Sequence, residues 1–282
     1  MKRIVKWTGI VLSGLIGLVL LMGLALYFIG MKNLTQTYPN ITIETINIPA
    51  DAEAIVHGKH VSIIWSCTKC HGDDLSGKLL TKDPIEGTIP ILGIIPASNL
   101  TSGKVGIAES YTDTDWIRAI RHGVMPDGQV EIFMYDYSAM SDQDLGDLIA
   151  YLKQIPPVAS DLPEMRYGPI IPIASAIGIF TPSAELIDHN ALHPAVTVPG
   201  PTKEYGEYLS TICFKCHSTK LASNLENWKQ EDFIRAIQTG VLPDGKQIGS
   251  TMSSKNFSEM NDMELSALWL YFQGLPSPKS QK

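Results

Sequence analysis

Cysteine is scarce in this sequence, with four residues in 282. All four lie in two copies of one pattern, Cys67-Thr68-Lys69-Cys70-His71 and Cys213-Phe214-Lys215-Cys216-His217. The two pairs are 146 positions apart, whereas zinc ribbons bring their pairs within about 15–20 residues of each other. The strand-helix-strand pattern that accompanies a thioredoxin-like dithiol is absent. A disulfide framework is compatible with the count, but it would leave the two histidines unexplained.

Each copy has the form Cys-x-x-Cys-His, which is the attachment site of c-type haem. Two thiols one helical turn apart can each form a thioether to one edge of a porphyrin, and the next residue then places its imidazole under the iron. The sequence therefore predicts two covalently bound haem c groups. The predicted thioether residues are Cys67, Cys70, Cys213 and Cys216, and the predicted axial histidines are His71 and His217.

Charged residues are missing from Trp7 to Met31, a run of 25 residues. At about 1.5 Å of rise per residue, a helix of this length can cross a hydrocarbon core about 30 Å thick. Three basic residues precede the run, so the positive-inside rule places the N-terminus in the cytoplasm and everything after Lys32 on the far side. The sequence therefore predicts a single-pass membrane helix.

The alternative to a membrane anchor is a cleaved secretory signal, which requires a small-x-small cleavage site. The only such triplet near the end of the run, Gly23-Leu24-Ala25, is followed by more apolar residues. We therefore expect residues 1–32 to be an uncleaved anchor. Either interpretation exports the rest of the chain, to the side on which a bacterium attaches haem to thiols.

Basic residues do not dominate the composition, because the formal net charge is −7. Residues 1–32 hold four basic residues and no acid, so the exported part carries a net charge of −11. This balance excludes a nucleic-acid partner and favours a partner with a basic docking face. An acidic surface that is simply solvated is the alternative.

Strand patterns are weak, whereas helical patterns repeat. Residues 117–128 return as residues 234–245, with Ile-Arg-Ala-Ile and a Pro-Asp-Gly turn in both copies. Apolar residues then recur at helical spacing in both halves: Leu145, Leu148, Ile149 and Leu152, and Leu265, Leu268, Trp269 and Phe272. Ser141 and Asn261 each stand three residues before an acid, which predicts helix caps. The sequence therefore predicts two helical domains, 52–157 and 201–276, that use haem as part of their cores.

The remaining segments connect these parts. Residues 33–51 are expected to be a linker, 158–200 a proline-rich strap and 277–282 a tail. Within the strap, Tyr167 to Ala184 lacks charge and contains three prolines, which argue against a second membrane span. We expect this stretch to pack between the two domains, and contact with the membrane surface or a membrane partner is the alternative.

The second axial ligand decides whether each iron is closed or open to small molecules. Met134 and Met252 occupy nearly the same place in the repeat and are the predicted ligands. Met140 and Met260 also correspond, but each precedes a helix cap, where an apolar packing residue is expected. Met125 is a rival in the first copy only, because its counterpart is a leucine.

The other polar candidates are expected to be ordinary packing or surface residues: His57, His60, His122, His189 and His193. Arg118 and Arg235 recur at one place in the repeat and could pair with haem propionates, although exposed helix arginines are the equal alternative.

The chain resembles the membrane-anchored dihaem c-type cytochromes of bacteria, in particular the cytochrome subunits of periplasm-facing dehydrogenases. Besides the haem motifs, the resemblance is carried by these segments: 98–101, 111–128, 140–157 and the N-terminal helix running into Tyr38. It implies an all-α fold with two cytochrome c-like domains in tandem after a transmembrane helix. In that family the distal methionine is often followed by proline, whereas here Tyr135 and Ser253 follow.

The predicted function is one-electron transfer at the periplasmic side of the bacterial cytoplasmic membrane, with no catalytic residues. Electrons would pass from a dehydrogenase or quinol-oxidising complex to a soluble cytochrome or terminal oxidase. The alternative is a dihaem enzyme, peroxidase-like or thiosulfate-oxidising, which needs an open iron and a nearby acid/base group. A haem-based sensor would need a cytoplasmic output module, and the predicted cytoplasmic part is only a few residues long.

Overall fold

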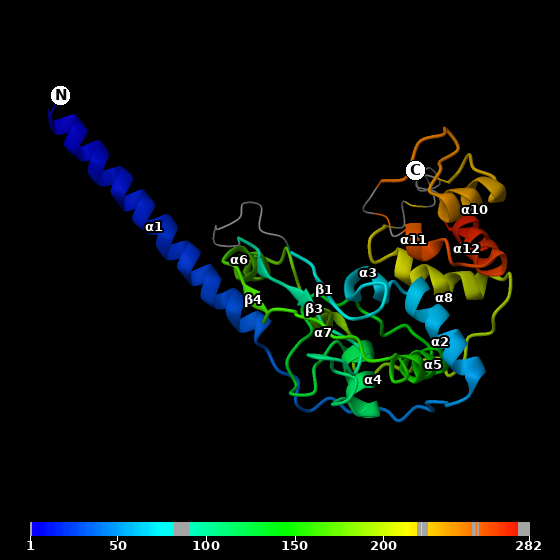
Figure 1. Cartoon of the computed structure of the whole chain (residues 1–282). Helices are drawn as coiled ribbons and strands as arrows, with labels where there is room; N and C mark the ends of the chain where they lie inside the picture. The colour runs from blue at the N-terminus through cyan, green and yellow to red at the C-terminus, as the bar shows by residue number, and fades with distance from the viewer. Residues whose placement is uncertain are drawn as a thin grey trace.

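The fold is helix-rich, and the computed structural model describes residues 2–81, 91–218, 221, 225–249, 252 and 254–275 (Figure 1). Its helices are α1 (Lys2–Leu34), α2 (Ala52–Ile64), α3 (Cys67–His71), α4 (Asp113–His122), α5 (Asp142–Leu152), α6 (Ile170–Ala176), α7 (Ser183–Leu186), α8 (Lys203–Cys213), α10 (Gln230–Thr239), α11 (Ser254–Phe257) and α12 (Asp262–Gly274). The predicted end of the second domain at Pro276 and the predicted tail lie outside the described residues.

The strands are two residues long and form two antiparallel pairs. β1 (Lys78–Leu79) pairs with β3 (Pro96–Ala97), and β2 (Gly93–Ile94) pairs with β4 (Arg166–Tyr167). The first pair lies within the segment that follows the first Cys-x-x-Cys-His motif, and the second pair joins that segment to the strap. These short pairs hold loops together and do not form a sheet layer.

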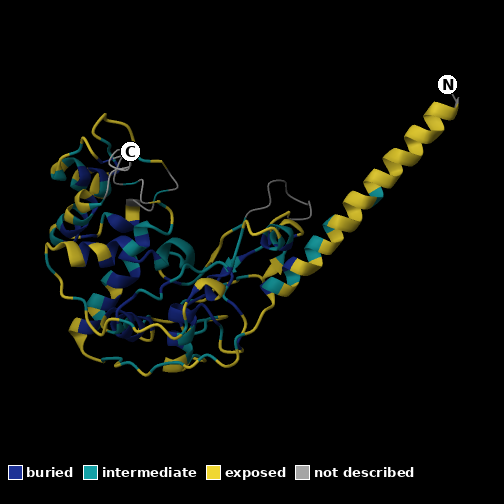
Figure 2. Ribbon diagram, turned by 180° about the vertical axis from the view of Figure 1, so that it is seen from behind, coloured by how far each residue is buried: buried dark blue, intermediate teal, exposed yellow. Residues whose placement is uncertain are grey.

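Helix α1 extends away from the rest of the molecule, with most of its surface exposed (Figures 1 and 2). By length and composition it is apolar enough to cross a membrane. Its last turn is different, because Leu34 is buried in a small core cluster with Val124, Val130, Ile132 and Ala184. The C-terminal end of α1 is therefore fixed to the body of the protein.

The first helical unit is built on the contact between α2 and α5. A Cβ on Gly58 of α2 would lie 1.9 Å from the Asp147 carbonyl oxygen of α5, so only glycine permits this approach. Ser141 caps α5 as predicted, its hydroxyl accepting from the Asp144 N–H. Helix α4 completes the unit, beginning at a capping box between Thr112 and Asp115.

The second unit repeats this arrangement with α8 and α12. A Cβ on Gly206 would lie 2.0 Å from the Ala267 carbonyl oxygen, which matches the contact at Gly58. Asn261 caps α12 as predicted. Helices α4 and α10 both end at a glycine with left-handed backbone angles, Gly123 and Gly240. Each helix is followed by its own copy of the Pro-Asp-Gly turn.

The uncharged stretch of the strap does not pack between the two units, and that prediction is wrong. Its helix α6 lies against α1, where a Cβ on Gly30 would be 1.7 Å from the Pro172 carbonyl oxygen. Asn33 of α1 also donates a hydrogen bond to the Ser175 hydroxyl of α6, at 3.5 Å. Gly30 and a short proline-containing helix together permit a close contact that the composition alone did not reveal.

The two units instead contact each other through their own helices. The Tyr208 hydroxyl of α8 donates to Asp144 of α5 at 2.5 Å and accepts from the Ser141 N–H at 3.1 Å. His60 of α2 lies 2.7 Å from Glu264 of α12, a carboxylate that is almost fully buried. Polar bonds therefore fix the relative position of the units.

Candidate functional site

A cavity with about 1010 Å³ of empty volume, partly open to solvent, lies beside α3 in the first unit. Cys67, Cys70 and His71 line one part of it, and Met134 also lines it. The remaining walls are mainly apolar and aromatic, including Trp116 and Tyr137. The structure therefore brings the four predicted haem-binding residues of the first copy around one mainly apolar space.

The His71 ring is oriented by the backbone. Its Nδ1 lies 2.8 Å from the Ser98 carbonyl oxygen, so Nδ1 carries the proton and Nε2 is left as the free electron-pair donor. Burial lowers the pKa of His71, although the bond to Ser98 opposes this. The imidazole is therefore held neutral, the form that a metal requires.

Two polar groups in the cavity wall lack partners. Trp116 Nε1 and Ser66 Oγ are buried and have no hydrogen-bond partner among the described residues. Because a buried donor without a partner costs about 1–3 kcal/mol, a polar edge on the molecule that fills this cavity would stabilise the fold. A haem, apolar in its body and polar at its propionates, fits both the wall and these two groups.

One acidic side chain, Glu131, also lines the first cavity. Burial raises its pKa to about 7, and the charge of Asp127 adds to the effect. Sequence reasoning missed this residue, since nothing in the local pattern distinguishes it from a surface glutamate. Among the described residues that line this cavity, it is the only one with a carboxyl group.

A second cavity, of about 680 Å³ and also partly open, is lined by the corresponding residues of the other copy. Cys213, Cys216, His217 and Met252 all contribute to its wall. The structure thus brings together each predicted set of four, in two separate places. All eight side chains remain predicted haem ligands, because the cavities themselves do not identify what fills them.

The two cavities share part of their walls. Ser66 and Tyr135 line both of them, and Lys69 of the first motif lines the second. The Tyr135 hydroxyl lies 3.8 Å from Cys216 Sγ, and burial raises its pKa to about 12, with Cys216 contributing. In the sequence, Tyr135 is noticeable only as the residue after Met134. Cys216 lies 81 positions further along the chain, so residue spacing does not predict that the two side chains are close.

Cys67 and Cys213 differ from the cysteines of a reactive dithiol. None of the four forms a disulfide. Burial raises the pKa of Cys67 and of Cys213 to about 12, whereas reactive dithiols have a lowered pKa. Within the described part of the chain, no three His, Cys, Asp or Glu side chains are grouped as a metal site would require. The raised pKa of Cys67 and Cys213 therefore argues against a reactive dithiol.

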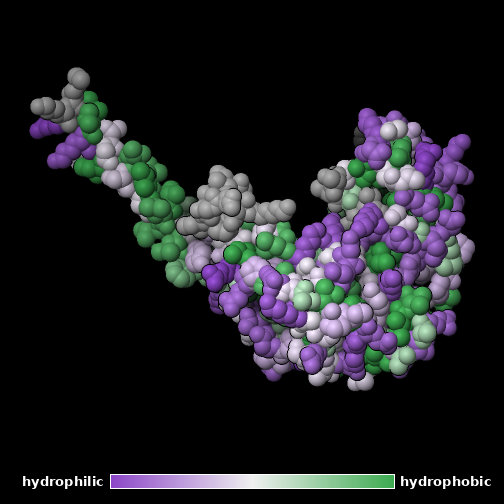
Figure 3. Space-filling view, viewed as in Figure 1, coloured by the Kyte–Doolittle hydropathy of each residue, from purple (hydrophilic) through white to green (hydrophobic). Residues whose placement is uncertain are grey.

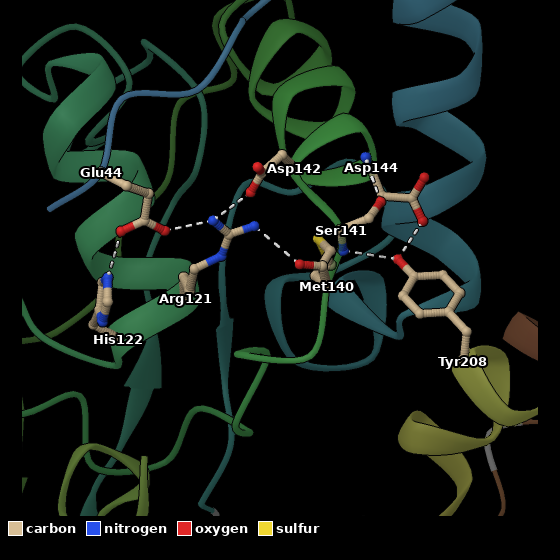
Figure 4. Close-up of polar contacts among 8 residues, drawn as sticks. All are labelled: Glu44, Arg121, His122, Met140, Ser141, Asp142, Asp144 and Tyr208. Carbon is tan, nitrogen blue, oxygen red and sulfur yellow. Dashed lines mark hydrogen bonds and ion pairs between the residues drawn. The ribbon is translucent and has the colours of Figure 1, made fainter. Parts of the chain in front are cut away.

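A buried network behind the first cavity holds the loop that carries Met140 (Figure 4). The fully buried Arg121 donates to Glu44, to Asp142 at 2.8 Å and to the Met140 carbonyl oxygen at 2.9 Å. Burial raises the pKa of Glu44, but hydrogen bonds from His122 and Arg121 outweigh it and hold the pKa well below its usual value. The expected linker, which contains Glu44, is thereby fastened to the first unit.

The other polar candidates take structural positions. His57 and His60 bond to carboxylates, and His122 is buried against Glu44 and His189. His193 is half-exposed, with its pKa lowered by burial. Arg235 pairs with Asp232 on the surface of α10, and neither Arg118 nor Arg235 is among the described residues that line the two cavities above. Met140 and Met260 are buried in the core, as expected, although Met140 also forms part of the first cavity wall.

A Cys-x-x-Cys-His helix beside an apolar cavity that also holds a methionine defines the first unit as a haem-binding domain of the c type. Comparison with known proteins agrees. Residues 55–156, from α2 to just beyond α5, match the family described as Cytochrome c, a family that implies covalently bound haem c.

Curated relatives extend the similarity over more of the chain. The fructose dehydrogenase cytochrome subunit of Gluconobacter japonicus is 23% identical, covering 81% of this chain and 54% of the relative. The gluconate 2-dehydrogenase cytochrome c subunit of Pantoea cypripedii is 29% identical, covering 61% and 39%. The alcohol dehydrogenase (quinone) cytochrome c subunit of Gluconobacter oxydans is 26% identical, covering 81% and 56%.

These relatives share a type of name, and each is longer than this chain. Each is named as a cytochrome subunit, an electron-transfer component, which agrees with the expectation that this chain is not itself a catalytic subunit. The chain spans between about two fifths and just over half of these relatives.

Proposed function

We propose that the protein is a membrane-tethered dihaem cytochrome c that relays single electrons. Cys67, Cys70 and His71 with Met134 would hold one haem, and the corresponding residues Cys213, Cys216 and His217 with Met252 would hold the other. When bound, a haem supplies one-electron redox chemistry at its iron. The protein residues hold it covalently, orient the axial imidazole and exclude water from the apolar wall.

The observation that carries the proposal is the shared wall between the two cavities. Because Ser66 and Tyr135 line both, groups held in the two cavities would be separated by little more than one layer of side chains. This short separation would favour electron transfer between the two haems within a single chain. By similarity to its relatives, the donor would be a periplasm-facing dehydrogenase, with a soluble cytochrome or terminal oxidase as acceptor, and α1 would hold the protein in the cytoplasmic membrane.

A dihaem enzyme is the second candidate, and Glu131 is the observation that favours it. A carboxyl group with a pKa of about 7 inside the first cavity has the property expected of a general acid or base. Met134 lines the same cavity, however, and would have to leave the iron for a substrate to bind. The relay therefore has the better support.

The test uses the full chain purified with its cofactor. Intact mass and haem absorption would give the number of covalent haems, and EPR with added carbon monoxide would give the coordination of each iron. We expect two low-spin haems that do not bind carbon monoxide. A single haem would contradict the dihaem proposal, and a high-spin haem that binds the gas would support the enzyme instead.

The Cys213→Ala/Cys216→Ala variant is the matched control for the haem count. It removes only the second attachment site and is expected to retain one covalent haem. If this variant and the natural chain carry the same amount of haem, the second motif does not attach the cofactor.

A further inference from the structure

Apolar side chains are exposed on the body of the protein next to the end of α1. They belong to the residues just before β2 and to α6 with the turn that follows it: Ile91, Leu92, Ile170, Ile177 and Ile179. We call this set the apolar collar. Backbone hydrogen bonds join its parts. The Ile170 N–H donates to the Ile91 carbonyl oxygen, which links the two segments, and the Ile179 N–H donates to the Ala174 carbonyl oxygen, which links the turn to α6.

The collar is fixed relative to α1 and does not hang from a loose strap. Pro172 of α6 approaches Gly30 so closely that a Cβ there would lie 1.7 Å from the Pro172 oxygen. Leu34, one turn later, is buried in the body. In the space-filling view, hydrophobic residues accordingly lie on the body close to the end of α1 (Figure 3).

The length of α1 determines the depth at which the apolar collar lies in the membrane. From Trp7, a residue type that favours the membrane interface, to Gly30 the helix rises about 35 Å. A hydrocarbon core is about 30 Å thick, and the headgroup layers bring the bilayer to about 40–45 Å. Gly30, and with it α6, therefore lies at the depth of the far headgroup layer when α1 spans the membrane.

The distribution of charged residues around the apolar collar is consistent with a place in the headgroup layer. No charged residue occurs from Tyr167 to Ala184, so α6 and the turn that follows it would bring no charged side chain into the interface. In the described part of the chain, Lys32 near the end of α1 and Arg166 just before the uncharged stretch are exposed, and basic side chains at the end of a spanning helix favour the membrane interface.

We infer that the apolar collar inserts into the outer surface of the same bilayer that α1 spans. The inference rests on the proposed membrane anchor and adds a second contact, which would prevent the haem units from swinging freely on α1. Phe180, which follows the collar, stacks on Phe133 of the first cavity wall with ring centroids 5.3 Å apart. The first cavity would thereby be held at a fixed orientation to the membrane.

The experiment is photo-crosslinking of the full haem-loaded chain in nanodiscs of palmitoyl-oleoyl phosphatidylcholine. p-Benzoyl-phenylalanine replaces Ile179, which is 75% exposed, and, in a matched variant, Leu192, which is 99% exposed. Both positions lie in the strap, but the stretch around Leu192 is bonded to α5, since Asp142 donates to the Pro194 carbonyl oxygen. We expect a lipid adduct, measured by mass, at position 179 and none at position 192.

A third variant, with the crosslinker at Leu15 in the middle of α1, separates failure of the collar from failure of the anchor. A lipid adduct at position 15 without one at position 179 would overturn the collar and leave the anchor standing. Absence of lipid at both positions would overturn the anchor and the collar together. An adduct from position 179 to a second copy of the chain would assign the surface to self-association and also overturn the inference.

Discussion

At the scale of single residues, the proposal depends most on Met134 and Met252, because the second axial ligand decides between a closed and an open iron. Both side chains line the cavity that contains the corresponding Cys-x-x-Cys-His motif. In the first cavity Met140 and Met165 also line the wall. The choice of Met134 comes from the repeat, since it has a counterpart at Met252.

Replacing Met134 by alanine is expected to open one iron and leave the other closed. The methionine-to-iron charge-transfer absorbance should fall by about half, with the covalent haem content unchanged because Cys67 and Cys70 remain. Carbon monoxide binding and near-infrared absorption measure the change. Met125→Leu is the control, since it introduces the residue found at the equivalent position in the second unit and Met125 does not line the cavity. If the absorbance were undiminished in Met134→Ala, Met134 would not be the second axial ligand, and Met140 or Met165 would take its place as the candidate.

At the scale of helices, local sequence was a good guide. The apolar spacing and the caps at Ser141 and Asn261 predicted α5 and α12, and the structure confirms both helices and both caps. Hydrogen bonds over three or four residues determine such features, so they can be recognised in a single sequence. The contact of α6 with α1 and the bond from Arg121 to Glu44 join residues far apart in the chain, and no local pattern encodes them.

Close packing of α2 on α5 makes Gly58 sensitive to a single added methyl group. In Gly58→Ala the new Cβ would meet the backbone of Asp147, which cannot rotate away, so we expect a loss of about 1–3 kcal/mol in unfolding free energy. Urea denaturation of the full chain in detergent, followed by circular dichroism, measures it. Gly274→Ala is the matched control, because its Cβ would meet only the flexible Lys203 side chain. Equal stability of the two variants would show that the helices can separate at little cost.

At the scale of the whole molecule, the cavities depend on how the two units are joined. Tyr135 reaches the second cavity from the first unit, so a shift of one unit against the other would alter the wall that they share. The sequence repeat predicted two units but not their relative position. That position is fixed by side-chain bonds such as Tyr208 to Asp144 and His60 to Glu264, which pair residues 64 and 204 positions apart.

The bond between His60 and Glu264 should make the junction of the units sensitive to pH. The hydrogen bond to Glu264 raises the pKa of His60, although burial opposes it. A histidine whose pKa is higher in the folded protein contributes stability that is fully present below its unfolded pKa, near 6.5, and is lost as pH rises through the folded pKa. Unfolding free energy should therefore fall as pH increases above about 6.5, by an amount no larger than the roughly 1.5–3 kcal/mol of a hydrogen bond to a charged group.

Substituting His60 by glutamine should reduce this dependence, because glutamine keeps a donor to Glu264 but does not titrate. Urea unfolding of the full chain on both sides of neutral pH measures the slope, and His57→Gln is the control. His57 bonds to Asp147 within the first unit, at 2.7 Å, and does not join the two units. We expect the slope to keep its full size in His57→Gln and to become smaller in His60→Gln, where the part that remains belongs to other groups such as Glu131, whose pKa burial raises to about 7. If His60→Gln kept the whole slope, the titrating group would lie elsewhere, and the bond between His60 and Glu264 would not account for the pH dependence.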